Sequence, residues 1–414
     1  MDFFLIMENK TDLKEVYKLT ADEERKNYLR IVPYCLLLYA AGFGQYVVAP
    51  LIPVIGSDLS ITQSSTILLI SIYGYATAIL ALLGGWTTHL FSVRGSFLVG
   101  GILAVVGLMG RAFSPTYIPF LLFDIVAASG LPFLYGSMGA VSESMFRNKA
   151  HLIIGITTAS FFLGLASGGF LGPYLIPGNH IFYAMLTPAV VALVALVLYL
   201  FAIKGYPNYY ARKSIRGSFK PGMIKNWYLG FASAGVAVML GTEVATMLLH
   251  FHVNNAISNA GLIAGLAYIG SAVGSLTIPP TFERLGKSRI GLVMNGLMSL
   301  VVGSIAVISL TFSPNVVLLA VTFFFFGVFG NALLVMGMAS VVKYVSDPGE
   351  AGLATSMFTV MEFVGVGVVP LFLGPGLLGF PDAAVILTIG LVAVAFVLSF
   401  FIRTKKLEAK AATA

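Results

Sequence analysis

Three carboxylic acids stand inside long apolar stretches of this sequence, and two histidines, His250 and His252, follow one of them. The stretch "GTEVATMLLHFH", residues 241–252, holds Glu243 and His250, and two further apolar stretches hold Asp124 and Glu362. A charge at the centre of a membrane helix costs roughly 2.5 to 3.5 kcal/mol, so such groups face water, a partner or a ligand. A carboxyl group removed from water also holds its proton more readily. Glu243, Glu362 and Asp124 are therefore candidates for loading and releasing protons.

Each acid also has a structural explanation. Asp124 and Arg111 are expected at similar depth near the outer ends of neighbouring helices, where they would form a salt bridge. Glu243 and Glu362 have no basic residue at their depth. They would then remain protonated and bond to helix neighbours.

A metal site is a further alternative for the quoted stretch. Glu243, Met247 and His250 lie at helical spacing on one face and offer ligands to a soft metal. A metal site needs more ligands at fixed geometry, and the sequence supplies no obvious set. We expect no metal and no other cofactor.

The elements that must position these residues are membrane-spanning helices. Of 414 residues, 58% are hydrophobic and only 10% are charged. This is a larger share of apolar residues than the core of a soluble protein requires. A helix needs roughly 20 apolar residues to cross the bilayer, and backbone groups in lipid must pair within the span. The sequence therefore predicts an all-α membrane protein with twelve transmembrane helices, at 29–55, 62–89, 94–113, 116–145, 149–176, 179–204, 226–252, 260–281, 289–312, 315–344, 350–375 and 382–403.

The basic residues predict the orientation of these spans. Of the 24 Lys and Arg residues, all but Arg111 fall on one side of the predicted helices. The side rich in Lys and Arg is the cytosolic one. Both termini are therefore predicted in the cytosol of a multi-pass protein of the cell membrane. The net charge of +7 follows from this bias and calls for no nucleic-acid partner.

Two short repeats divide the chain into halves. "FSP" at 113–115 recurs at 312–314, and "FLGPYL" at 170–175 recurs as "FLGPGL" at 372–377. Repeats at this separation predict two parallel bundles of six helices. The predicted parts are a cytosolic tail at 1–28, a bundle at 29–203, a cytosolic linker at 204–225, a second bundle at 226–403 and a tail at 404–414.

A loop motif makes the whole chain resemble the major facilitator superfamily of transporters. In that family, the loops after the second and eighth spans run Gly, three residues, Asp-Arg, one residue, Gly and two basic residues. "PPTFERLGKSR" departs from this pattern at Pro279, where the first Gly would stand, and otherwise matches it with Glu283, Arg284, Gly286 and Lys287. The resemblance implies that this loop is a cytosolic gate, latching the two halves through charge pairs.

The first copy of the motif is degenerate. In "GGWTTHLFSVRG", Gly85 is kept, but His89 replaces the acid, Leu90 the arginine and Ser92 the second glycine. Arg94 is the only fixed charge that remains. The resemblance implies the role of cytosolic gate for Gly85, His89 and Arg94 on fewer matching residues than in the second copy.

Two weaker likenesses accompany this one. Gly155, Gly164 and Gly168 match part of the family's antiporter motif, although Gly169 stands where Pro is expected; the glycines serve either close helix packing or antiport. The stretch "GRAFSPTYIPFLLFDIVAASGLPFLYGS" resembles the feline leukaemia virus subgroup C receptor-like branch, which includes carriers of choline-like cations.

The resemblance also implies where the site lies. In this family the first, fourth, seventh and tenth helices line a central cavity, and the second, fifth, eighth and eleventh flank it, so all three acids fall on helices that reach the cavity. Aromatic rings on the same helices suit cations, with ordinary packing as the alternative. The predicted substrate-binding residues are Gln45, Tyr46, Asp124, Tyr135, Glu243, His250, Asn331 and Glu362.

The charges predict the substrate. Apart from Arg111, no Lys or Arg lies deep in the spans, and acids in a poorly solvated cavity repel anions. We expect a monomeric secondary active transporter, not an enzyme, that moves a small cationic or neutral amphiphilic organic solute by alternating access. Its partners are expected to be this small-molecule substrate, protons and the lipid bilayer. The alternatives are a carrier of a small organic anion or metabolite, and a membrane sensor that transports nothing.

Overall fold

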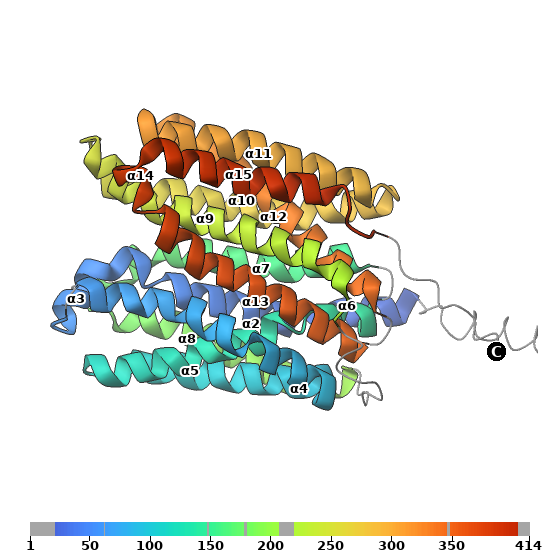
Figure 1. The fold of residues 1–414 in the computed structure, drawn as a ribbon. Coiled ribbons are helices and arrows are strands. Elements are labelled where there is room, and N and C mark those ends of the chain that lie inside the picture. The colour runs from blue at the N-terminus through green and yellow to red at the C-terminus, as the bar shows by residue number, and fades with distance from the viewer. Residues whose placement is uncertain are drawn as a thin grey trace, which may run out of the picture.

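Long helices running side by side along one axis make up nearly all of the described chain (Figure 1). The computed structural model describes residues 21–61, 63–146, 149–177, 180–206, 219–345 and 348–404. No strand occurs within these ranges, and ten helical segments in them are long and apolar enough to cross a membrane. The prediction of an all-α membrane protein is confirmed.

Two features reconcile ten segments with twelve predicted spans. Helix α4 (Gln63–Ala112) is 50 residues long and joins the second and third spans across a kink at Ser92, where φ is 61° and ψ is −177°. Helix α2 (Ala21–Tyr46) carries the first span but begins with the charged run "ADEERK", and Arg30 and Gln45 make its span less apolar than the ten.

The remaining helices follow the predicted order. The fourth span is broken into α5 (Tyr117–Tyr135) and α6 (Met138–Met145). Two short helices, α3 (Ile52–Asp58) and α14 (Gly376–Gly379), lie in connections. The other spans are α7 (Ala150–Leu171), α8 (Phe182–Ala202), α9 (Ile224–His250), α10 (Ala256–Arg284), α11 (Ser288–Phe312), α12 (Val316–Val341), α13 (Pro348–Leu373) and α15 (Pro381–Ser399).

The helices form two halves that meet along two pairs of helices. Helices α2 to α8 lie below helices α9 to α12 and α15 in the view of Figure 1, with α13 at the boundary. Across it, α4 packs on α13 and α7 packs on α10. The domain boundaries remain predictions, because residues 1–20, 207–218 and 405–414 of the tails and the linker lie outside the described residues.

Glycines of α7 let this helix approach its neighbour α2 closely. A Cβ atom at Gly164 would collide with the backbone oxygen of Tyr39, and one at Gly168 would lie 2.7 Å from the backbone nitrogen of Val47. Small residues permit such backbone contact between membrane helices. The prediction that Gly164 and Gly168 serve close helix packing is confirmed.

Similar contacts join the halves on the side where α2 begins and α15 ends, which we call the termini side (Figure 1). A Cβ at Gly155 of α7 would collide with the backbone oxygen of Ser275 in α10, and one at Gly85 of α4 would collide with Ser356 of α13. The Thr355 hydroxyl donates to the Gly136 carbonyl oxygen at 2.9 Å. The halves are thus in direct contact on this side.

Candidate functional site: a cavity between the two halves

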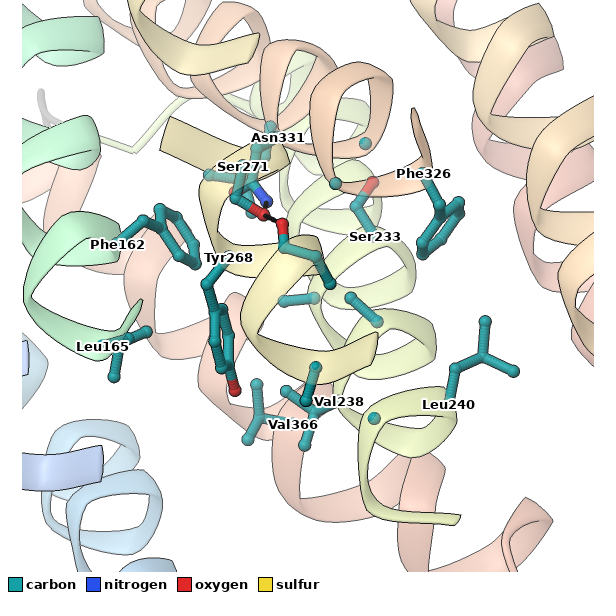
Figure 2. Close-up of a pocket in the computed structure, with 18 of the residues that line it drawn as sticks. Phe162, Leu165, Ser233, Val238, Leu240, Tyr268, Ser271, Phe326, Asn331 and Val366 are labelled. Carbon is teal, nitrogen blue, oxygen red and sulfur yellow. Dashed lines mark hydrogen bonds between the residues drawn. The ribbon is translucent and has the colours of Figure 1, made fainter. Parts of the chain in front are cut away.

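A cavity of about 130 Å³ lies between the halves. Helices α2 and α7 of the first half and α9, α10, α12 and α13 of the second contribute to its wall. Figure 2 shows Phe162 of α7 beside Tyr268 of α10, with Ser271 and Asn331 next to one another. Most of the wall is apolar, and its aromatic members are Phe161, Phe162, Tyr268, Phe323, Phe326 and Phe363.

Glu362 is the one acidic residue of this wall, which includes no Lys or Arg among the described residues. It is 5% exposed, and its Oε1 accepts a hydrogen bond of 3.4 Å from the Tyr135 hydroxyl of the other half. Its Oε2 has no hydrogen-bond partner in the described part of the chain. The Tyr135 ring stands edge-on to Phe161 at 5.5 Å and to Phe363 at 6.2 Å, so Tyr135 lies directly behind the wall.

Two amides, Gln45 and Asn331, stand on this wall with the hydroxyl groups of Ser233, Tyr268 and Ser271. Asn331 Nδ2 donates to Ser271 Oγ at 2.6 Å, and Ser271 Oγ donates to the Ala267 carbonyl at 2.8 Å. Gln45 lies at the end of α2, and its neighbour Tyr46 sets its ring edge-on to Tyr268 at 4.8 Å. Gln45, Asn331 and Glu362 are thus brought together, as predicted from the sequence.

Asp124 lies away from the cavity, contrary to expectation. Its Oδ1 accepts from Arg111 Nη1 at 2.6 Å, and both side chains are fully buried within the first half. Arg111 Nη2 also donates to the Gly44 carbonyl at 2.9 Å, and its guanidinium lies 5.7 Å from the centre of the Phe120 ring. The alternative prediction, a salt bridge between Asp124 and Arg111, is confirmed. Arg111 neutralises the negative charge that was expected to face the substrate.

Glu243 and His250 also lie outside the cavity wall. Glu243 is half-buried, and a Cβ at Gly374 would lie 2.6 Å from its Oε1. His250 is exposed, with its ring edge-on to Phe251 at 5.2 Å. Helix α9 turns Gly241 to the cavity, and Glu243 follows two residues later, about 200° further around the axis.

The second copy of the loop motif links the two halves. Glu283 Oε1 lies 3.8 Å from Lys343 Nζ, and the backbone N–H groups of His151 and Leu152, at the start of α7, face its carboxylate. Gly286 has a φ of 66°, which glycine adopts without strain. Arg284 and Lys287 are exposed.

The first copy acts within its own half. Arg94 Nε donates to the Tyr206 carbonyl at 2.6 Å and Nη2 to the Lys204 carbonyl at 3.0 Å, both just after α8. His89 is buried, and Ser92 repeats the positive φ of Gly286 although it carries a side chain. Its contacts with the other half come from Gly85, which lies against Ser356, and from Thr88, whose side chain lies against Gly352.

Several residues of the cavity wall were missed by sequence reasoning. Tyr268, Ser271 and Phe162 carry no charge and lie in apolar runs like those that face lipid. The glycines of α10 could have indicated that Tyr268 faces other helices. Gly265 and Gly270 flank Tyr268 and allow close approach of α7 and α12.

The sequence matches a known family and a curated relative. The family model described as Major Facilitator Superfamily matches residues 34–311 and 227–414. The cyanate transport protein CynX of Escherichia coli (strain K12) is 24% identical over 240 residues, which are 56% of this chain and 61% of that protein. The match thus spans under two thirds of the relative's length.

Solved structures share the fold over nearly the whole chain. The Escherichia coli fucose:proton symporter FucP superposes with a TM-score of 0.69 at 15% identity, covering 92% of this chain and 100% of that one. The human organic anion transporter MFSD10 gives a TM-score of 0.73 at 16% identity, covering 91% and 99%. At these identities the likeness shows the fold, and the twelve-helix architecture with two six-helix bundles is confirmed.

Proposed function

Because the chain belongs to the major facilitator superfamily, we propose that this transporter moves a small cationic or neutral amphiphilic organic solute by alternating access, coupled to protons through Glu362. The observation that carries this proposal is a buried carboxyl group on the cavity wall, with one oxygen unpartnered in the described chain and no basic residue beside it.

Glu362 suits both parts of this function. When ionised, it accepts from Tyr135 and attracts a cation; when protonated, it loses that attraction. Because Tyr135 and Glu362 belong to different halves, a change in this bond acts where the halves must separate. FucP, a fucose:proton symporter, gives a precedent for proton coupling on this fold.

The proposed binding set changes with the structure. Gln45, Asn331 and Glu362 bind the solute, with Tyr46 and Tyr135 supporting the wall from behind. Proton coupling is proposed for Glu362 and no longer for Asp124 or Glu243. We further propose a single copy in the cell membrane, with the termini side in the cytosol and Glu283 as the gate residue that holds the start of α7.

Transport by purified protein in liposomes tests the proposal. We expect counterflow, in which unlabelled solute inside speeds entry of labelled solute. Glu362→Gln should abolish uptake driven by a pH gradient and leave exchange measurable at saturating solute. The matched control is Asp382→Asn, which neutralises an exposed carboxylate at the start of α15. Full gradient-driven uptake by Glu362→Gln would refute the coupling, and a sensor would show no counterflow with any solute.

A small organic anion is the second candidate, favoured by the names of two related proteins. CynX is named a cyanate transport protein, and MFSD10 an organic anion transporter. Glu362 on the cavity wall argues against an anionic solute, because it would repel an anion. Arg111 does not offset this charge, because it is bound to Asp124. Counterflow of labelled cyanate or benzoate, without exchange of cations, would establish this alternative.

A further inference from the structure

Three acceptor oxygens of the cavity wall have no donor among the described residues. They are Oε1 of Gln45, Oδ1 of Asn331 and Oε2 of Glu362. Buried polar atoms in proteins are almost always hydrogen bonded. Their side chains come from three helices, α2, α12 and α13, and line one cavity. A ligand in this cavity that carries donor hydrogens would supply what these residues lack.

The hydrogen bonds around Asn331 fix which of its atoms is free. Ser271 has one hydroxyl proton, and it goes to the Ala267 carbonyl. Ser271 Oγ must therefore accept from Asn331, which places the Asn331 NH₂ group on Ser271. The opposite orientation of the amide would require the Ser271 hydroxyl to leave the Ala267 carbonyl and donate to Asn331 Oδ1 instead. Oδ1 is thus the atom left over.

The charge of the wall narrows the kind of donor. Glu362 is the acid of the wall, and the rings of Phe161, Phe162 and Tyr268 stand on the same wall. Aromatic faces attract cations, and an ionised carboxylate forms its strongest hydrogen bonds with charged N–H donors. Neutral hydroxyl compounds satisfy the oxygens but not the charge.

We infer that the solute is a protonated primary amine or an amidine with a small apolar body. This inference rests on the proposed transport function and names its substrate class. A primary ammonium carries N–H donors for these acceptors, whereas a quaternary ammonium carries the same charge and no donor. Choline-like cations should therefore bind less tightly than a primary amine. Since one carboxylate does not hold a proton and an ammonium ion together, the two compete for Glu362, and the solute is exchanged for protons.

A matched series of ligands tests the inference on the purified full chain. Benzylamine, N,N,N-trimethylbenzylammonium, benzyl alcohol and benzoate share one ring and differ in charge and donors. Ligand binding raises the melting temperature by mass action. We expect benzylamine to bind roughly ten- to a hundredfold more tightly than the quaternary ion, as for loss of hydrogen bonds to a charged group. Benzoate should not bind. Equal binding of the two cations, or tighter binding of benzoate, would overturn the inference.

Variants of Gln45 locate the effect in the cavity. Gln45→Met keeps the length of the side chain and removes the acceptor, so the preference for benzylamine over the quaternary ion should fall about tenfold or less. Gln45→Glu keeps an acceptor at this position, so it should show a stronger preference for benzylamine than Gln45→Met does. Asn331→Leu gives the same test from the opposite wall if either Gln45 variant fails to fold. A preference unchanged in both Gln45→Met and Asn331→Leu would contradict the assignment.

Counterflow separates failure of this inference from failure of the proposed function. If benzylamine binds with the expected preference but is not exchanged, the ligand class stands and transport fails. If benzyl alcohol or benzoate is exchanged and benzylamine is not, transport stands and the ligand class fails. Acidifying the buffer should weaken benzylamine binding in the native chain and not in Glu362→Gln.

Discussion

Asp124 and Glu362 are both buried acids in apolar helices, one in each half, and they differ in what surrounds them. Asp124 is held by Arg111 at 2.6 Å, inside one bundle. Each acid keeps one oxygen without a hydrogen-bond partner in the described chain, but Glu362 has only the Tyr135 hydroxyl at 3.4 Å, no cation, and a place at the wall of a cavity. A paired acid supports its own bundle, whereas an acid without a cation beside a cavity is available to a solute or a proton.

The largest effect is expected from breaking the paired acid. Asp124→Asn leaves the Arg111 charge buried without its partner, which should lower the free energy of unfolding by about 3 to 5 kcal/mol. Chemical denaturation in detergent measures it. The double variant Arg111→Met with Asp124→Leu removes both charges and should recover most of the loss. A single variant as stable as the native chain would show that the pair is not structural.

The hydrogen bond between Tyr135 and Glu362 should contribute less to the free energy of unfolding than the Asp124–Arg111 pair does. Tyr135→Phe keeps the ring against Phe161 and Phe363 and removes only the donor to Glu362. The free energy of unfolding should fall by about 1 to 1.5 kcal/mol. Because the bond joins the halves, the variant should also change the rate of counterflow. An unchanged rate would confine Tyr135 to packing.

Removing the unpaired acid should affect stability least among these three positions. Glu362→Gln retains an acceptor for Tyr135, and no basic partner loses its counter-charge. We expect the free energy of unfolding to change by less than about 1 kcal/mol. Denaturation under the conditions used for Asp124→Asn makes the comparison direct. A loss as large as that of Asp124→Asn would mean that Glu362 has a structural partner after all.

Glu243 gives the smallest expected change. It is half-buried and outside the cavity wall. Glu243→Gln should change the free energy of unfolding by no more than about 0.5 kcal/mol and leave uptake driven by a pH gradient intact. Loss of that uptake would return Glu243 to the coupling mechanism.

The fold could be predicted from the sequence because lipid imposes a coarse rule. Apolar length and the placement of Lys and Arg are enough to predict spans and their order. The breaks are harder, because they depend on single backbone angles. Ser92 has a positive φ that serine rarely adopts, and the fourth span is interrupted between Tyr135 and Met138.

The site could be predicted only in part, for a geometric reason. Spacing shows that Glu243 and His250 share a face of α9, but it does not show which way that face turns. Gln45, Asn331 and Glu362 were found because polar residues are rare in such helices. Tyr268 and Phe162 were not, because an aromatic residue that lines a cavity looks the same in sequence as one that faces lipid.

The contacts that join the halves on the termini side are made by glycines and by the bond from Thr355 to the Gly136 carbonyl, with Glu283 and Lys343 partly exposed at the edge. Dissolved salt screens exposed ions strongly and dipoles sealed from water weakly. The glycine and Thr355 contacts should therefore hold equally well in dilute buffer and in brine, whereas the contact of Glu283 with the start of α7 should weaken as salt is added.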